Sequence, residues 1–276
     1  MNKIHIALVA SLIMPLITWA QSLKTDSTAV VKGVTAHRGY SAAYPENTLT
    51  AFKAAIDIRA DWVELDIHKT KDGQLVVSHD ATTKRNGDKD LIIANSTFED
   101  LKQVDVATGF RKKHNLTFAQ CPVQHMPLLR EALELIMQQK NTRLSIHPKT
   151  DCVPEALAIV KAAEAEKMVG FNSLNLKYMS DVKDLAPETP VFWDRQDTSD
   201  VDDDIRIAKE KGFETLVIRH NGITAEKIGK IHAANLKVGA WTVDSPAQME
   251  VLEKMGIDRI YTDDPKLLIM VKKRLQ

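Results

Sequence analysis

Short apolar segments alternate with stretches of helical period along almost the whole chain, and this alternation restricts the possible folds more than any other feature. Alternating strands and helices favour a parallel sheet whose strands are joined by crossover helices. We expect eight strands, at residues 34–37, 62–68, 143–147, 170–174, 190–194, 215–219, 237–241 and 258–262. Strand–helix barrels usually have about 250 residues. The sequence therefore predicts an α/β fold, a closed (β/α)8 TIM barrel.

A doubly wound open sheet is the alternative for the same alternation. Its usual signatures are a glycine-rich dinucleotide fingerprint or a GxxxxGK[ST] phosphate loop. Neither signature occurs in this sequence. The chain has 276 residues, 44% of them hydrophobic, which is enough for one barrel domain; we place that domain at residues 30–276.

The first residues have the pattern of a secretory signal. A lysine near the start is followed by an apolar run over residues 6–19 and then by Ala20 and Gln21. We therefore expect a signal peptide at residues 1–20, cleaved after Ala20, and a periplasmic or secreted protein. A membrane anchor is the alternative, but the run is short for a bilayer and Pro15 interrupts it. We expect no stable membrane span after cleavage.

Charge balance and cysteine count narrow the classes of partner. Basic and acidic residues number 37 each, so the chain lacks the basic excess that nucleic-acid binding requires, and we expect no nucleic-acid partner. Cys121 and Cys152 are the two cysteines. Two isolated thiols do not fill a tetrahedral metal site. In an oxidising compartment they predict one disulfide, with two free thiols as the alternative.

The longest break in the alternation runs from Asp80 to His125, after the second strand. Loops that follow barrel strands lie at the carboxyl end of the barrel, where active sites are found. We therefore expect an insertion that covers a substrate. Cys121 and Cys152 both fall in loops at this end, so a disulfide between them would tie the insertion to the loop after the third strand.

Several short motifs predict helix starts. Asn47 or Thr48 can cap the first helix after the first strand, and residues 96–100 resemble a capping box. The acidic run at residues 200–204 is typical of a solvated helix start, favoured by the helix dipole, rather than of a calcium loop.

Side chains of the second strand divide into two faces, because successive residues of a strand point to opposite sides. Glu64, Asp66 and His68 share one face, and the residues between them are apolar. We expect the polar face to point into the barrel, where adjacent carboxylates need a cation or a shared proton. A salt bridge to a neighbouring basic strand residue is the alternative. In the third strand His147 is placed to reach the same centre, followed by Lys149.

Two further histidines stand at strand ends, the position where barrel enzymes hold acids and bases. His37 is followed by Arg38, and His79 by Asp80. A carboxylate beside an imidazole can fix its tautomer and orientation. Together with the inward carboxylates of the second strand, these residues predict a phosphate-processing centre.

The motifs HRG, PENT, ELD, KDG, VVSHD, MPLLREAL, AWTV and GIDRIYTDDP occur in this order over nearly all of the chain that follows the predicted signal. In this respect the sequence resembles the glycerophosphodiester phosphodiesterase family. The resemblance implies a TIM barrel of the phospholipase-C-like phosphodiesterase type, with an insertion after the second strand. It also implies hydrolysis of a small-molecule glycerophosphodiester to glycerol 3-phosphate and an alcohol, with a divalent cation, commonly calcium or magnesium.

The resemblance further implies roles for individual residues: acid/base catalysis by His37 and His79, phosphate or substrate contact by Arg38, Lys149 and Trp241, and metal binding by Glu64 and Asp66. Glu46 and Asn47 would belong to the ordered first loop of the family.

The third strand departs from the family pattern. Where the family usually reads like NIEIK, with an acidic metal ligand, this chain reads SIHPK and has His147. An imidazole removes a negative charge and a hard oxygen ligand, which favours zinc or manganese over calcium. Two alternatives to a metal-dependent hydrolase follow from the residues. One is a metal-independent or cyclising phospholipase-like barrel, and the other is a binding protein that has lost turnover because of His147.

Overall fold

A closed parallel sheet forms the centre of residues 33–275, the part of the chain that the computed structural model describes. Its eight strands are β1 (Gly33–Ala36), β2 (Trp62–Lys69), β4 (Arg143–Pro148), β5 (Val169–Ser173), β6 (Val191–Arg195), β7 (Thr215–Arg219), β8 (Lys237–Trp241) and β9 (Arg259–Thr262). β1 pairs in parallel with both β2 and β9, which closes the barrel. The predicted fold is confirmed, and each predicted strand matches within one residue at either end.

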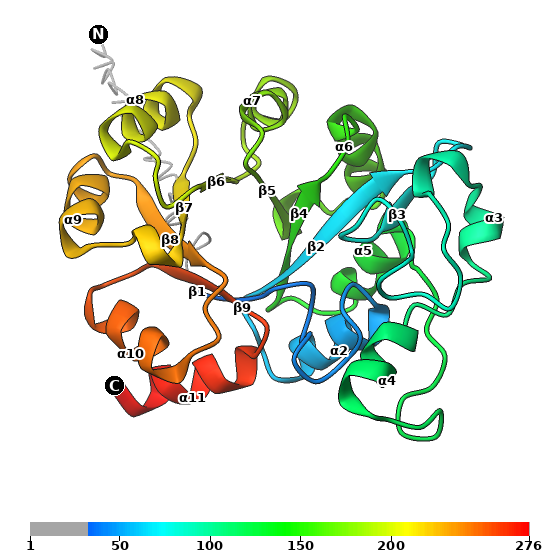
Figure 1. The fold of residues 1–276 in the computed structure, drawn as a ribbon. Helices are drawn as coiled ribbons and strands as arrows, with labels where there is room; N and C mark the ends of the chain where they lie inside the picture. Colours follow the sequence, from blue (N-terminus) through cyan, green and yellow to red (C-terminus); the bar gives the residue numbers. More distant parts are fainter. Residues whose placement is uncertain (1–32, 276) are drawn as a thin grey trace, which may run out of the picture. The chain divides into compact units, whose positions relative to one another are not determined.

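Helices follow the strands and form a ring outside the sheet (Figure 1). They are α2 (Leu49–Asp57), α5 (Leu129–Met137), α6 (Val153–Ala162), α7 (Leu176–Leu185), α8 (Val201–Lys211), α9 (Ala225–Ala233), α10 (Pro246–Lys254) and α11 (Pro265–Leu275). Short 3-10 turns lie at Glu166–Met168 and His220–Gly222. No helix among residues 33–275 has the length and apolarity needed to cross a bilayer. The predicted signal peptide lies outside the described residues.

The two faces of β2 have the burial that its alternation predicts. Val63, Leu65 and Ile67 belong to the apolar core between the sheet and the helices. On the opposite face Trp62 packs edge-on against Phe192, with ring centroids 5.0 Å apart, inside the barrel. Bulky side chains therefore fill one level of the barrel interior, and the polar residues of β2 come after that level along the strand.

The insertion after β2 is an ordered unit with its own small core. It contains β3 (Leu75–Val77), which pairs antiparallel with the end of β2, the 3-10 turn η1 (Ile93–Asn95), α3 (Phe98–Leu101) and α4 (Thr108–His114). In Figure 1 these elements lie together on one side of the ring. Their core consists of Val76, Ile93, Leu101, Met126 and Leu128.

The predicted helix starts are mostly confirmed. Thr48 caps α2 by accepting a hydrogen bond from the Ala51 amide, and Thr97 forms a capping box with Asp100. Asp200 caps α8 as expected. Asp204 departs from the expectation of a solvated run, because it is buried and pairs with Arg195 at 2.7 Å.

The predicted disulfide is wrong. Cys121 and Cys152 are both buried and both free thiols. Cys152 precedes α6 and packs in the core between sheet and helices. Cys121 lies within the insertion, where its carbonyl accepts a hydrogen bond of 3.0 Å from Arg111. Shared location at one end of a barrel does not bring two Cβ atoms within the narrow range that a disulfide requires.

Candidate active site

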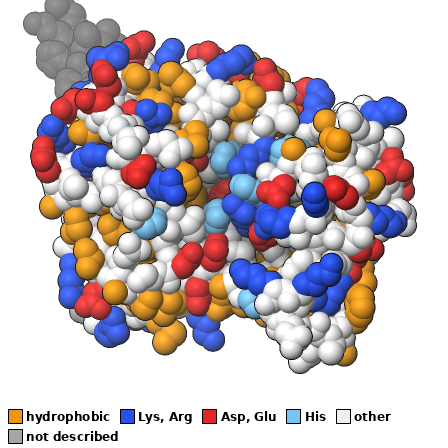
Figure 2. Space-filling model, viewed as in Figure 1, with side chains coloured by type: hydrophobic (Ala, Val, Ile, Leu, Met, Phe, Trp, Pro, Cys, Tyr) orange, Lys and Arg blue, Asp and Glu red, His pale blue; other side chains and the backbone are white. Residues whose placement is uncertain are grey.

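A cavity of about 210 Å³ opens at the carboxyl ends of the barrel strands. All eight residues predicted as site residues line it: His37, Arg38, Glu64, Asp66, His79, His147, Lys149 and Trp241. Histidine side chains gather with lysine and arginine at the centre of this face of the molecule (Figure 2). A larger hollow of about 690 Å³, lined by residues of α2 and α5, contains none of them. The chemistry is therefore concentrated in the smaller cavity.

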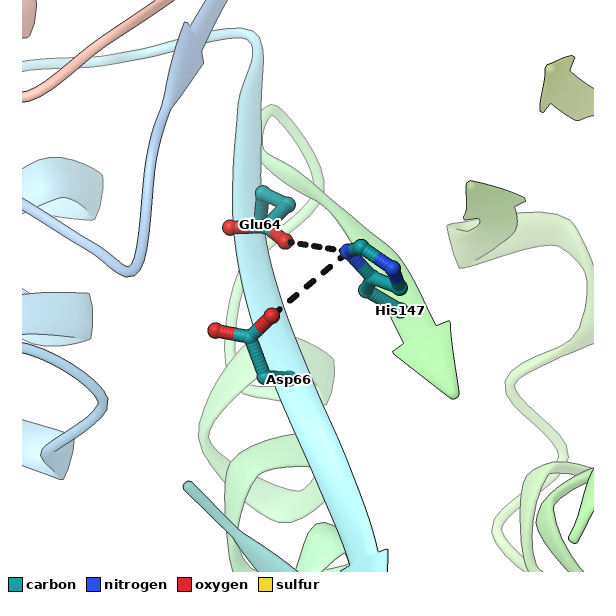
Figure 3. A group of neighbouring side chains, drawn as sticks. All are labelled: Glu64, Asp66 and His147. Carbon is teal, nitrogen blue, oxygen red and sulfur yellow. Dashed lines mark ion pairs between the residues drawn. The ribbon is translucent and has the colours of Figure 1, made fainter. Parts of the chain in front are cut away.

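Glu64, Asp66 and His147 form the most compact group in the cavity. In the parallel pairing of β2 with β4, Asp66 lies directly opposite His147. The His147 Nδ1 atom is 3.5 Å from Asp66 Oδ1 and 3.7 Å from Glu64 Oε1, and the three side chains point toward one another (Figure 3). One ligand atom from each lies within 4.8 Å of the others, so the group could hold a metal ion. Its two carboxylates and one imidazole suit manganese or zinc.

Asp66 is buried and is surrounded by donors and cations. Lys149 Nζ lies 3.0 Å from Oδ1, and Arg38 Nε lies 3.5 Å from Oδ2. Asn47 donates a hydrogen bond of 2.9 Å to Oδ2. Burial raises the pKa of Asp66, but the charges of Lys149, His147 and Arg38 outweigh it and hold the pKa well below its usual range. The carboxylate is therefore ionised. A salt bridge to a basic residue, the alternative to a bound cation in the sequence analysis, is present between Asp66 and Lys149.

His37 is held by a carboxylate from the last strand. Its Nδ1 atom lies 2.7 Å from Asp263 Oδ1, just after β9. Because an ionised carboxylate only accepts, Nδ1 carries the proton in this contact and Nε2 is the other functional atom. Burial lowers the pKa of His37, but the Asp263 hydrogen bond and the negative charge of Glu64 outweigh it, so the pKa is raised above its ordinary value.

His79 is also held at Nδ1 by a carboxylate, but its pKa is shifted in the opposite direction. Its Nδ1 atom lies 2.6 Å from Asp80 Oδ1. Burial lowers the pKa of His79, and the positive charges of Arg38 and Lys149 reinforce that shift. The attraction of Asp66 and Asp80 opposes it but does not reverse it, so the pKa is below its ordinary value. A pH range therefore exists in which His37 is protonated and His79 is neutral.

The HRG turn places His37 and Arg38 side by side. Arg38 has φ of 57° and Gly39 has φ of 83°, so two successive residues adopt left-handed conformations. A Cβ atom on residue 39 would lie 2.7 Å from the Ala51 Cβ, which explains the glycine. The Arg38 amide donates a 3.0 Å hydrogen bond to Glu64, and its guanidinium donates one of 3.0 Å to Glu46. The turn thus ties the first strand to the carboxylates of β2.

Arg85 of the insertion connects the two sides of the site, and the sequence analysis missed it. Its Nε atom donates to Asp80 at 2.6 Å, and its two terminal nitrogens contact Glu46 at 2.8 and 2.7 Å. Asp80 in turn holds His79, and Glu46 holds Arg38. Burial raises the pKa of Asp80, but Arg85 and His79 lower it to about 2. Loop residues such as Arg85 carry no periodic signal that would identify them.

Polar residues of β5 and β6 lie beside the Glu64–Asp66–His147 group, and these were also missed. Ser145 donates to Asn172 at 2.7 Å, and Asn172 donates to Asp194 at 3.1 Å. Asn172 and Asp194 line the cavity, as does Tyr261 of β9. Burial is the main cause that raises the pKa of Asp194 to about 6. The strand alternation that identified Glu64 applies equally to Asn172 and Asp194 and could have found them.

Trp241 and His68 differ in their relation to the cavity. Trp241 lines the cavity, and its indole nitrogen donates to the Val217 carbonyl at 3.1 Å. His68 shares a face of β2 with Asp66 but does not line the cavity. It lies opposite Val76 of β3, and its Nε2 atom is 3.2 Å from the His79 carbonyl oxygen. His68 is therefore buried beside β3 and the segment that carries His79.

Comparisons with known proteins agree on one family. Residues 37–267 match the model of the glycerophosphoryl diester phosphodiesterase family. The chain is 32% identical over 247 residues to a glycerophosphodiester phosphodiesterase of Caldanaerobacter subterraneus subsp. tengcongensis, which covers 87% of this chain and 98% of that protein. It is 27% identical over 248 residues to a glycerophosphodiester phosphodiesterase of Bacillus altitudinis, which covers 87% of this chain and 98% of that protein.

A solved structure with the same fold contains a reaction product. It is an Oleispira antarctica phosphodiesterase in complex with the product sn-glycerol-3-phosphate, with a TM-score of 0.78 and 24% identity over 90% of this chain and 99% of that one. A Silicibacter pomeroyi structure has a TM-score of 0.78 with 22% identity, over 89% of this chain and 94% of that one. At this identity the likeness shows the barrel fold.

The opposite shifts of the two imidazoles can be measured directly. In an NMR titration of the protein kept free of metal with a chelator, His37 should titrate at higher pH than His79. Asp263→Asn removes the largest cause that raises the pKa of His37, so this variant should lower the His37 pKa and leave His79 nearly unchanged. A His37 that titrates below His79, or that does not respond to Asp263→Asn, would contradict the described electrostatics.

Proposed function

The chain belongs to the glycerophosphoryl diester phosphodiesterase family and is a phosphoric diester hydrolase, and we propose that it cleaves glycerophosphodiesters to glycerol 3-phosphate and an alcohol by metal-assisted catalysis with two histidines. One observation carries the proposal. His37 and His79 are each held at Nδ1 by a carboxylate, and both line the same cavity as the Glu64–Asp66–His147 group.

Arg38 and Lys149 would bind the phosphate group of the substrate. A phosphodiester carries one negative charge, and a nucleophile approaches its phosphorus only when that charge is neutralised. Both cations already lie within 3.5 Å of Asp66, so they are held at the centre of the cavity without a ligand. The Arg38–Glu46 hydrogen bond fixes the direction of the guanidinium. These residues therefore bind and orient the diester.

Glu64, Asp66 and His147 would hold the divalent cation, and their donor set fits one. When bound there, a divalent cation withdraws charge from a non-bridging phosphate oxygen. Calcium or magnesium is implied by the family, whereas the imidazole of His147 favours manganese or zinc. Lys149 and His147 both face Oδ1 of Asp66, whereas Asn47 and Arg38 contact Oδ2. A cation at this group would therefore compete with Lys149 for the Asp66 carboxylate.

The opposite pKa shifts of the two histidines support a division of roles between them. His79, with the lowered pKa, is neutral and takes the proton of the attacking oxygen at Nε2. His37, with the raised pKa, keeps its proton to higher pH than His79 and gives its Nε2 proton to the alkoxide that leaves phosphorus. The attacking oxygen belongs to water or to the neighbouring glycerol hydroxyl. The second case gives a cyclic phosphate, which water then opens.

Two other functions would use the same barrel. A metal-independent or cyclising phospholipase would retain turnover in chelator or release a cyclic phosphate as its final product. A binding protein without turnover would bind glycerophosphodiesters and release no glycerol 3-phosphate. The carboxylates that hold Nδ1 of both histidines support hydrolysis, because capture of a diester needs neither imidazole to have a set tautomer.

Removal of either imidazole tests the assignment. We expect His37→Ala and His79→Ala each to reduce kcat by roughly 10² to 10⁴, the usual contribution of a positioned acid or base. The measurement is glycerol 3-phosphate release from a panel of glycerophosphodiesters. His125→Ala is the matched control, because His125 is an exposed histidine of the insertion region. Substantial turnover in both site variants would refute the two-histidine mechanism.

The metal preference tests the role of His147. Activity should be lost in chelator and restored better by manganese or zinc than by calcium. His147→Glu supplies a third carboxylate and should shift the preference toward calcium or magnesium. If the same metals restore activity in the same order in wild type and in His147→Glu, then His147 is not a metal ligand. Activity that persists in chelator would favour the metal-independent alternative.

A further inference from the structure

A second cavity of about 330 Å³ adjoins the catalytic cavity. Arg38 lines both cavities, so they share a wall. The rest of the second lining joins the first loop of the barrel, with Glu46, to the insertion, with Arg85, Phe110 and Lys113. The second cavity is therefore bounded by the phosphate-binding arginine on one side and by α4 on the other.

We propose that this second cavity is the subsite for the leaving alcohol, and that it selects an uncharged, hydroxyl-rich head group over a quaternary ammonium. The inference rests on the proposed function and goes beyond it by naming the substrate class. A glycerophosphodiester carries two alcohol arms on one phosphate. Release of glycerol 3-phosphate requires that the bond from phosphorus to the head-group oxygen breaks, and that this oxygen receives a proton.

Location is the first argument. Asp263 lines the second cavity and holds His37, the proposed proton donor for the leaving oxygen, at 2.7 Å. His37 itself lines the catalytic cavity. An alcohol that extends from a phosphate on Arg38 into the second cavity would keep its leaving oxygen on the catalytic side of Arg38, which is the side that His37 lines. Size agrees with this placement. Ligand sites usually measure about 300–1,000 Å³, and the catalytic cavity alone, at about 210 Å³, is below that range. Together the two cavities reach it.

Charge is the second argument. Three cations, Arg38, Arg85 and Lys113, line the second cavity, against the carboxylates of Glu46 and Asp263. Both carboxylates already have partners. Glu46 accepts hydrogen bonds from Arg38 and Arg85, and Asp263 contacts His37. Arg38 and Arg85 are likewise paired with Glu46, whereas Lys113 has no ion-pair partner among the described residues. A quaternary ammonium would therefore meet one uncompensated cation and no carboxylate that lacks a partner, which is unfavourable at short range.

The kind of polar group is the third argument. Quaternary ammonium sites are built from several aromatic faces, whereas Phe110 is the one aromatic side chain among the described residues of this lining. The lining also holds the Ser41 hydroxyl and the Asn86 amide. A hydroxyl both donates and accepts hydrogen bonds, so a polyol can match such mixed partners, whereas a trimethylammonium group offers no N–H or O–H.

A matched pair of charge reversals on α4 tests the subsite. Lys113 lines the cavity and Lys112 does not, and both are exposed residues of the same helix. The measurement is the ratio of kcat/KM for glycerophosphoglycerol to that for glycerophosphocholine. Wild type should favour glycerophosphoglycerol. Lys113→Glu should lower the ratio about tenfold, because it replaces a cation by an anion at the cavity. Lys112→Glu should change the ratio by less than about twofold.

Binding measurements separate this inference from the mechanism. The His79→Ala variant should bind glycerophosphoglycerol more tightly than glycerophosphocholine, as judged by the two dissociation constants. Addition of Lys113→Glu to this variant should reduce that preference. If wild type cleaves neither diester, the proposed function fails, while the dissociation constants still decide the subsite. Preference of wild type for glycerophosphocholine, or equal responses to Lys113→Glu and Lys112→Glu, would overturn the assignment.

Discussion

Two carboxylates buried side by side on β2, Glu64 and Asp66, set the requirement that the rest of the site meets. Buried negative charges are costly unless cations or donors compensate them. Lys149 and Arg38 supply positive charge at Asp66, and His147 supplies an imidazole between the two carboxylates. The same arrangement that makes this burial tolerable also creates a place where a divalent cation and a phosphate can meet. The charges that compensate the buried carboxylates are therefore the same charges that the proposed catalysis would use.

The barrel and the insertion share this arrangement through Arg85. Its guanidinium contacts Asp80 and Glu46, which hold His79 and Arg38 respectively. A loop of the insertion thus fixes the orientation of the His79 imidazole and of the Arg38 guanidinium. The insertion therefore both orients side chains of the candidate site and supplies part of the wall of the second cavity.

Strand periodicity was enough to predict the barrel and the inward set of residues. The alternation in β2 and β4 placed Glu64, Asp66 and His147 on one face, and the structure brings them together. Contacts between loops leave no comparable periodic pattern in the sequence. The pairing of His37 with Asp263 joins residues 226 positions apart, and it depends on the closure of the sheet rather than on any local pattern. The predicted disulfide was wrong for the same reason. The sequence indicates at which end of the barrel a loop lies, but not the distance between two side chains.

Calorimetric titration of manganese into the protein is the most direct test of the buried carboxylate pair. The account predicts that wild type binds one ion per chain and that Asp66→Asn, which keeps the size of the side chain and removes its charge, abolishes binding. Lys149→Ala should tighten binding, because Lys149 competes for the same carboxylate. Unchanged affinity in Asp66→Asn would contradict the claim that the charge of β2 organises the site.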